Sequence, residues 1–180
     1  MEKVHFSYDS TICLGCCACQ VACQTTHGLG QGEFFRRVTI QRDRNGRAVP
    51  FSGACNHCEK PACVAACPTG AMYRDEETGL VLHDEGICIG CGCCVWNCPY
   101  GAVSISLTRG VSQKCDSCLD RREAGLAPAC VAACSMEALR WEDPAAAGEG
   151  WKQLGADFLP DPDLTEPTTA VRFLREEVAL

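Results

Sequence analysis

ICIGCGCCVWNCPYGA, residues 87–102, holds five cysteines, one more than a single metal centre needs. Bacterial ferredoxins have the spacing C-x2-C-x2-C-x3-C followed by proline, and their last cysteine ligates a second cluster. This spacing leaves Cys93 as a spare thiol and selects as ligands Cys88, Cys91, Cys94 and Cys98. The stretch therefore predicts a loop that binds one 4Fe-4S cluster and sends its last cysteine to another.

Three other blocks of the chain carry related spacings. The first repeats C-x2-C-x2-C-x3-C, the second has C-x2-C-x4-C-x3-C, and the fourth has C-x2-C-x11-C-x3-C. Together the four blocks supply sixteen candidate ligands, enough for four 4Fe-4S clusters. Cys17 is a second spare thiol, and we expect Cys17 and Cys93 to be small buried hydrophobic side chains. The ligands of the three other blocks are Cys13, Cys16, Cys19 and Cys23; Cys55, Cys58, Cys63 and Cys67; and Cys115, Cys118, Cys130 and Cys134.

The spacing has a physical reason. Gly15, Gly90 and Gly92 let the backbone approach a cluster without a Cβ clash. An x3 step is about one helical turn, so the last cysteine of a block leaves on a helix and faces a second cluster. Pro68 and Pro99 follow two of these cysteines and end the turn.

Composition also favours a metal protein. Cysteine accounts for 18 of the 180 residues, and aromatic residues for only 7%. A core built from side chains alone would be thin, so metals or disulfides must stabilise the fold. Zinc is an alternative metal. Zinc sites usually use two pairs of cysteines or histidines, without the third cysteine at x2 spacing and the fourth at x3 spacing that are seen here. Disulfides are disfavoured because close-set cysteines on one loop pair poorly.

The formal charge of −7 argues against nucleic acid or an anionic membrane surface as a partner. The sequence contains no run of 18 apolar residues, so we expect no membrane span. The N-terminus lacks the pattern of a secretory signal. We expect the protein to be cytoplasmic, or to be exported folded with a signal-bearing partner and held at a membrane through an anchor subunit.

The pattern of apolar residues predicts an α+β fold of short helices, small antiparallel sheets and much loop. After residue 142 the chain is rich in Pro, Asp and Gly, which predicts an extended arm with one short helix around residues 144–154. This arm would wrap the protein's own surface, dock a partner, or do both. Expected strands are 3–8, 34–42 and 102–107, with a hairpin over 72–83, and expected helices are 19–26, 61–67, 94–98, 116–125 and 128–134.

Four segments carry a resemblance to a known family. They are ICLGCCACQVAC, CNHCEKPACVAACPTGAMY, ICIGCGCCVWNCPYGAV and KCDSCLDRREAGLAPACVAACSMEAL, and FLPDPDLTEPTTAVRF near the C-terminus matches as well. Each block alone is a common ferredoxin signature, but all four in this order are specific. The chain resembles the four-cluster iron–sulfur subunit of dimethyl sulfoxide reductase-type molybdopterin oxidoreductases.

The resemblance implies how the blocks share ligands: the first with the fourth, and the second with the third. Two interleaved ferredoxin-like modules result, residues 1–48 with 103–143 and residues 49–102, followed by the arm at 144–180. The nitrate reductase branch of the family has a non-cysteine residue where this chain has Cys94, so four cubane clusters are expected. The implied ligand sets are Cys13, Cys16, Cys19 and Cys134; Cys115, Cys118, Cys130 and Cys23; Cys55, Cys58, Cys63 and Cys98; and Cys88, Cys91, Cys94 and Cys67.

The resemblance further implies a non-catalytic subunit of an anaerobic respiratory complex. It would relay electrons between a quinol-linked membrane partner, or another donor, and a large molybdopterin-containing catalytic subunit. The alternative is a polyferredoxin-type carrier associated with a hydrogenase or formate dehydrogenase. The sequence has no obvious nucleophile–base pair, and GLGQG (28–32) is interpreted as a flexible turn because it opens no βαβ unit.

Three further residues lie close to the cysteine blocks. Lys114 precedes Cys115, and we hypothesise that its charge raises the reduction potential of that cluster; otherwise it faces solvent or a partner carboxylate. His57 lies inside the second block and is expected to donate a hydrogen bond to a cluster or partner rather than to ligate. Trp96 is expected to serve in packing rather than as an electron relay.

Overall fold

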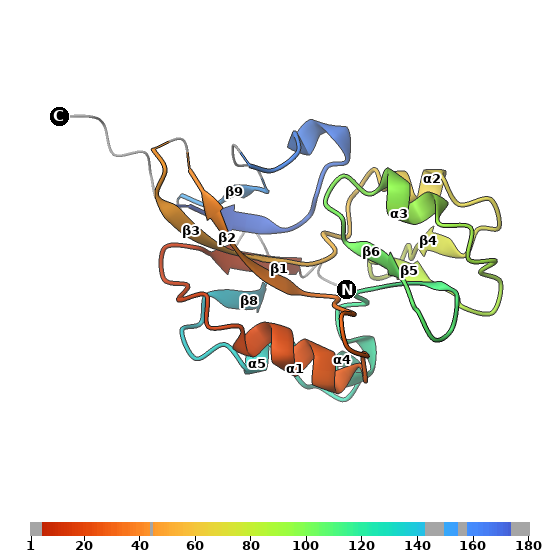
Figure 1. Cartoon of the computed structure of the whole chain (residues 1–180), viewed down its shortest axis with the longest axis horizontal. Coiled ribbons are helices and arrows are strands. Elements are labelled where there is room, and N and C mark those ends of the chain that lie inside the picture. The colour runs from red at the N-terminus through yellow and green to blue at the C-terminus, as the bar shows by residue number, and fades with distance from the viewer. Residues whose placement is uncertain (1–4, 44, 143–149, 155–157, 174–180) are drawn as a thin grey trace.

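The computed structural model describes residues 5–43, 45–142, 150–154 and 158–173. The fold is α+β, with short helices and small sheets, as predicted. The largest sheet has four strands in the order β8-β1-β10-β9 (Figure 1). Strand β1 (His5–Asp9) is antiparallel to β8 (Leu139–Glu142) and parallel to β10 (Ala170–Arg172), which pairs with β9 (Lys152–Gln153). One parallel pair thus departs from the antiparallel expectation.

Strand β1 is buried along its whole length despite its mixed polarity. Phe6 packs edge-on against Trp141 with ring centroids 4.8 Å apart. The hydroxyl of Tyr8 donates to the carbonyl of Pro50 at 2.7 Å. On the other face of the strand the hydroxyl of Ser7 donates to the Glu142 carboxylate at 2.5 Å. Every polar group named here has a partner, which is why a polar strand can lie inside the protein.

Three antiparallel hairpins deliver the chain to the cysteine blocks. Gly53 at the end of the first leads into the second block, His83 at the end of the second leads into the third, and Lys114 at the end of the last leads into the fourth. The middle hairpin, around an Asp75–Gly79 turn, is the one predicted for residues 72–83. The pairs are β2 (Arg37–Arg42) with β3 (Ala48–Gly53), β4 (Met72–Arg74) with β5 (Val81–His83), and β6 (Val103–Ile105) with β7 (Ser112–Lys114).

The helices are short and follow the cysteine loops, close to the predicted positions. Pro61 and Pro128 precede α2 and α5, where the fixed φ of proline prepares a helical turn. Helix α1 contacts α5, and α2 contacts α3. Figure 1 shows α1, α4 and α5 together below the main sheet, and α2 and α3 beside β4–β6 at the other end of the molecule. The bounds are α1 Ala18–Thr26, α2 Ala62–Ala65, α3 Cys93–Asn97, α4 Leu119–Glu123 and α5 Ala129–Ala132.

Cysteines make up much of the interior, as the low aromatic content suggested. Two clusters of buried apolar residues are present among the described residues. The larger joins the main sheet, through Phe6, Tyr8 and Leu139, to four buried cysteines. The smaller joins Met72 and Val81 to two more. The hydrophobic cores therefore surround the cysteine blocks rather than standing apart from them.

The C-terminal segment is part of the main sheet, through β9 and β10. The helix expected around 144–154 falls mostly outside the described residues, and its described end forms β9 instead. A 3-10 turn, η2 (Pro162–Leu164), precedes a stretch that bonds to the second cysteine block: Lys60 N–H donates to the Thr165 carbonyl at 3.0 Å. None of the described helices is long and apolar enough to cross a membrane.

Leu154 and Leu164 offer a matched test of the C-terminal segment. Leu154 is 1% exposed in the core, whereas Leu164 is 64% exposed. We expect Leu154→Ala to lower the free energy of unfolding by about 2–5 kcal/mol, and Leu164→Ala to change it by less than about 0.5 kcal/mol. Anaerobic guanidinium unfolding followed by tryptophan fluorescence measures the difference. Equal midpoints for the two variants would show that this segment does not support the core.

Candidate iron–sulfur sites

All eighteen cysteines lie in the described part of the chain, and all are free thiols rather than disulfides. Predicted ligands from different blocks lie close to one another, and we describe them in the four sets that the family resemblance implies. We name each set by its first cysteine. The Cys13 set lines one cavity together with Gly15 and the spare Cys17, and its members are Cys13, Cys16, Cys19 and Cys134.

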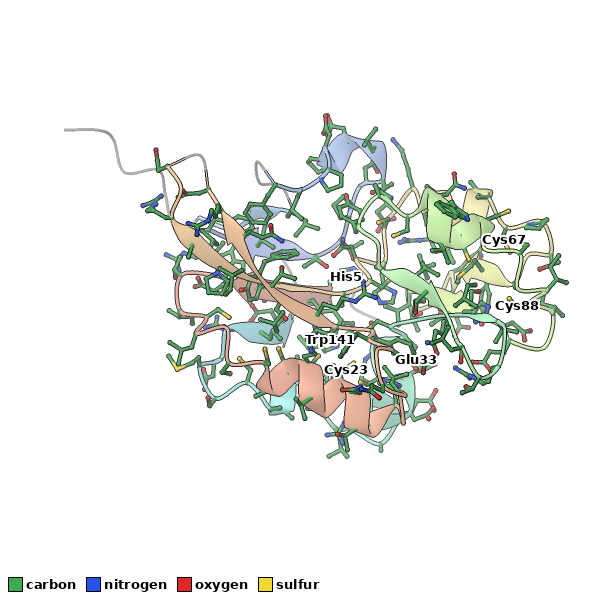
Figure 2. The ribbon with its side chains drawn as sticks, in the orientation of Figure 1. His5, Cys23, Glu33, Cys67, Cys88 and Trp141 are labelled. Atoms are coloured by element: carbon green, nitrogen blue, oxygen red, sulfur yellow. The ribbon has the colours of Figure 1, made fainter. Side chains whose placement is uncertain are left out.

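The Cys115 set gathers around helices α1 and α5 and consists of Cys115, Cys118, Cys130 and Cys23. Burial, with the thiols of Cys130 and Cys118 nearby, raises the pKa of Cys23 to about 12. Burial and the thiols of Cys23 and Cys130 raise the pKa of Cys115 well above its usual value. Figure 2 shows Cys23 on α1, below the main sheet.

The Cys55 set consists of Cys55, Cys58, Cys63 and Cys98. Burial, with the thiols of Cys55 and Cys98 nearby, raises the pKa of Cys58 to about 11. Burial and the same two neighbours raise the pKa of Cys63 to about 12. Thiols with such values stay protonated at neutral pH unless a metal cation replaces the proton. The donors therefore suit a bound metal rather than reactive free thiolates.

The Cys88 set consists of Cys88, Cys91, Cys94 and Cys67. Burial acts to raise the pKa of Cys88, but hydrogen bonds from Ser112 and from the Gly90 N–H outweigh it and hold the pKa below its usual value. The N–H groups of Met72 and Thr69 similarly outweigh burial at Cys67, whose thiol lies close enough to act on Cys88 and Cys94. In Figure 2 Cys67 and Cys88 lie together at the end of the molecule away from the main sheet.

Backbone N–H groups point at one or more sulfurs in every set. Gly15 donates to Cys13 and Ser117 to Cys115, at 3.4 and 3.3 Å. Met72 and Ala102 donate at 3.4 Å to Cys67 and Cys98, the cysteines that open the repeated C-P-x-G-A motif. Such donors stabilise sulfur that carries negative charge and are one means by which proteins set cluster potentials. The donor atoms thus fit 4Fe-4S clusters.

The two spare thiols differ from the prediction, because both are half-buried rather than buried. Cys17 adopts a left-handed φ of 64°, which matches the φ of 76° at Gly92 in the third block. Cys17 therefore occupies the position of a turn glycine. Cys93 opens helix α3, and a side-chain hydrogen bond with Cys91 raises its pKa. The spacing of the cysteines did not predict this contact between Cys93 and Cys91.

The two ring hydrogen bonds of His57 in the described structure join it to Val81 and Ser117 rather than to a sulfur. Its Nδ1 accepts from the Val81 N–H at 3.1 Å, so its Nε2–H donates to the hydroxyl of Ser117 at 2.8 Å. Burial, together with the charge of Lys114, lowers the pKa of His57 well below its usual value and keeps the ring neutral. His57 thus joins the second and fourth blocks, and the expected hydrogen bond to a cluster or partner is replaced by this internal one.

Lys114 is buried, so the alternative expectation that it faces solvent was wrong. Its ammonium donates to the carbonyls of Val81 and Cys115, the latter at 3.0 Å. The charge also acts to lower the pKa of Cys63. Lys114 therefore lies between the Cys115 and Cys55 sets. By contrast, Trp96 is 87% exposed, so the prediction that it packs into the protein was wrong for this chain.

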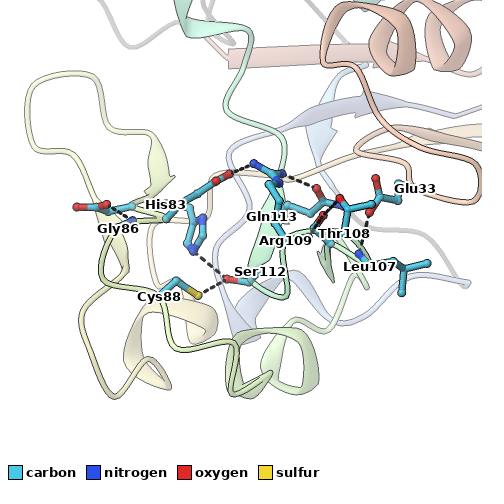
Figure 3. A network of polar contacts seen from close by, with 12 residues as sticks. Glu33, His83, Gly86, Cys88, Leu107, Thr108, Arg109, Ser112 and Gln113 are labelled. Atoms are coloured by element: carbon cyan, nitrogen blue, oxygen red, sulfur yellow. Dashed lines mark hydrogen bonds and ion pairs between the residues drawn. The ribbon is translucent and has the colours of Figure 1, made fainter.

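A polar network fixes the third block to the β6–β7 hairpin (Figure 3). The hydroxyl of Ser112 bonds to His83 Nε2 at 2.9 Å and to the sulfur of Cys88 at 3.4 Å. On the same hairpin Arg109 donates to Gln113 at 2.9 Å and pairs with Glu85. The network makes Ser112 a hydroxyl partner of a predicted ligand.

Two residues beside the cysteines escaped sequence reasoning. His27 Nε2 lies 3.4 Å from the sulfur of Cys118 and 3.8 Å from the Asp116 carboxylate. Arg36 is buried just before β2, within reach of several thiols. No cysteine spacing marks either residue. The alternating pattern of residues 34–42 was the signal that could have identified Arg36. In such a stretch neighbouring side chains lie on opposite faces, so one of two adjacent arginines faces inward.

Thiols gathered from different blocks, with backbone N–H donors to sulfur, fit an iron–sulfur protein of the electron-transfer class. A family described as the 4Fe-4S dicluster domain matches residues 47–143. The chain is 38% identical to the B subunit of the anaerobic dimethyl sulfoxide reductase of Haemophilus influenzae, with 96% of this chain and 90% of that protein covered. It is 40% identical to a thiosulfate reductase electron transfer subunit of Salmonella typhi, over 74% of this chain and 72% of that protein.

The corresponding dimethyl sulfoxide reductase subunit of Escherichia coli is 42% identical to it, over 74% of this chain and 70% of that protein. The chain therefore belongs to the family of iron–sulfur subunits of dimethyl sulfoxide reductase-type molybdopterin oxidoreductases. Members of this class carry electrons and are not the catalytic subunits. The electron-transfer prediction is thus confirmed.

Gly90 offers a test of the third-block loop. It has φ +67°, and a Cβ there would lie 2.2 Å from the Gly110 carbonyl oxygen. We expect Gly90→Ala to displace Cys88 and Cys91 and to remove about four iron atoms per chain, one cluster. Gly101→Ala is the matched control, because Gly101 has φ +59° with nothing within 4 Å of the added Cβ. Iron analysis of both proteins, purified without oxygen, gives the answer, and equal iron contents would contradict the expected clash.

Proposed function

We propose that this chain relays single electrons through four 4Fe-4S clusters, one on each cysteine set. When bound, such clusters accept and release one electron at a time over a wide range of potentials. The grouping of the sixteen thiols into four sets, each with four cysteines and an N–H donor, supports this count. The ligands proposed are those of the Cys13, Cys115, Cys55 and Cys88 sets.

The arrangement of the helices supports two interleaved modules. Helices α1 and α5, which contact each other, carry ligands of the first and fourth blocks. Helices α2 and α3 do the same for the second and third blocks. In each module, each block would thus supply one cysteine ligand to the cluster of the other block. The resulting modules are residues 1–48 with 103–143 and residues 49–102, and residues 144–180 follow them.

The single observation that carries the proposed relay is the order of the sets. Cys55 and Cys115 lie in the same cluster of buried residues, so the Cys115 and Cys55 sets are neighbours. Both of these thiols are buried. Cys16 and Cys91, in the Cys13 and Cys88 sets, are exposed. The path therefore runs from one exposed set through two inner sets to a second exposed set.

Both exposed sets carry apolar side chains on their outer loops. Leu14 and Ile89 occupy equivalent positions in the first and third blocks and are 70% and 67% exposed. Trp96 lies beside the second of these loops. Such groups near an electron exit suit docking of another protein. We propose a large molybdopterin-containing catalytic subunit as one partner and a quinol-linked membrane anchor as the electron donor.

The decisive experiment is metal analysis of the full chain purified without oxygen, alone and with whatever chains accompany it. We expect about sixteen iron and about sixteen acid-labile sulfide per chain, the content of four cubane clusters. Electron paramagnetic resonance of the reduced protein should show interacting clusters, and a large molybdenum-containing chain should co-purify. Zinc, or no metal, would overturn the proposal. About twelve iron per chain would mean three 4Fe-4S clusters rather than four.

Lys114 gives a second prediction. A buried cation favours the more negative, reduced form of a nearby cluster. We expect Lys114→Met to lower one or two midpoint potentials by about 60 mV, a tenfold change in a one-electron equilibrium. Lys60→Met is the control, because the Lys60 side chain is 68% exposed and pairs with Glu166. A redox titration in which Lys114→Met shows no fall would refute this role.

A further inference from the structure

Arg36 and Arg37 are adjacent arginines with opposite environments. Arg36 is 3% exposed, whereas Arg37, the first residue of β2, is exposed. Burying a guanidinium is unfavourable unless hydrogen bonds and negative charge compensate for the lost water. The groups around Arg36 therefore indicate which negative charge its guanidinium compensates.

The hydrogen bonds of Arg36 lead to a predicted ligand. Its Nη1 donates to the Ser52 carbonyl at 3.0 Å and to the Ser52 hydroxyl at 3.2 Å. That hydroxyl lies 3.4 Å from the sulfur of Cys19. The guanidinium also lies over the ring of Phe6, 4.8 Å from its centroid. These contacts hold the cation in one position inside the protein.

The negative charge that Arg36 needs comes from sulfur. No carboxylate of the described residues forms an ion pair with it. Phe6, over which the guanidinium lies, belongs to the same buried cluster as Cys19, Cys115 and Cys130, so thiols surround the cation. Interactions with buried thiols raise the pKa of Arg36 despite its burial. In return, its charge acts to lower the pKa values of Cys19 and Cys23. The four thiols are Cys130, Cys115, Cys19 and Cys23.

These four thiols belong to two different sets. Cys19 is a member of the Cys13 set, and the other three are members of the Cys115 set. Arg36 therefore stands between two neighbouring electron sites. Lys114 lies at a different pair of sets that shares one member with this pair, since its carbonyl partners and its effect on Cys63 place it between the Cys115 and Cys55 sets.

We propose that Arg36 is a positioning residue that serves as the shared counter-cation of the Cys13 and Cys115 sets and raises the reduction potentials of both. The inference rests on the cluster assignment proposed above. Each one-electron reduction adds a unit of negative charge to a site that Arg36 faces in a poorly screened interior. A neutral side chain at this position would favour the oxidised form of both sites.

The test is a redox titration of the full chain, followed by electron paramagnetic resonance, for Arg36→Met, Arg36→Lys and Arg37→Met. In Arg36→Met, two of the four midpoint potentials should fall so that the reduced-to-oxidised ratio at a fixed potential drops about tenfold, which corresponds to about 59 mV. Arg36→Lys keeps the charge and should restore most of the shift. Arg37→Met should leave all four potentials in place.

Three results would overturn the inference: no potential falls, all four fall alike, or Arg36→Lys behaves as Arg36→Met. Where Arg36→Met loses its clusters, Arg36→Gln keeps a donor for Ser52 without the charge, and the same two potentials should fall. Iron and sulfide analysis of the unaltered chain separates the two proposals. Fewer than about sixteen iron defeats the four-cluster assignment, whereas full iron with unmoved potentials defeats the role of Arg36 alone.

Discussion

Crowding of sulfur is the constraint on which this structure depends. Thiols gathered around one centre repel one another once ionised, and burial removes the water that would screen them. The raised pKa values of Cys23, Cys58 and Cys63 are the signature of this conflict. Metal cations resolve it, because coordination deprotonates a thiol and supplies positive charge where it is needed. Folding and metal binding are thus one thermodynamic event in a chain of this kind.

The polypeptide adds its own compensation around the sulfurs. Left-handed residues such as Gly15, Gly90 and Cys17 turn the loops so that N–H groups face sulfur. Hydroxyls do the same where a hairpin runs past a loop, as Ser52 does at Cys19 and Ser112 at Cys88. The hairpins therefore carry polar groups to the interior as well as linking one cysteine block to the next. This explains why so much of the fold is loop and short strand.

Cysteine spacing was the strongest signal in the sequence, because ligand geometry restricts it more than any core packing would. The helices after each loop and the β4–β5 hairpin were also predicted, since their local patterns are clear. Strands β3, β7 and β8 were missed because two of them have three or four residues and Pro50 lies within the other. Their existence depends on distant partners. The roles of Arg36 and His27 were invisible for the same reason, and the exposure of Trp96 reflects a surface that sequence periodicity does not describe.

Strand β1 lies between β8 and β10, so residues at the start of the chain pair with Leu139–Glu142 and with Ala170–Arg172. Contacts of such long sequence separation form late, because the intervening chain must be ordered first. During synthesis the middle blocks can fold around local hairpins, whereas the main sheet has to wait until Ala170–Arg172 has left the ribosome. The first cysteine block would remain open for most of that time. The middle blocks can thus become ordered around their local hairpins before the main sheet, which needs β1, β8 and β10 together.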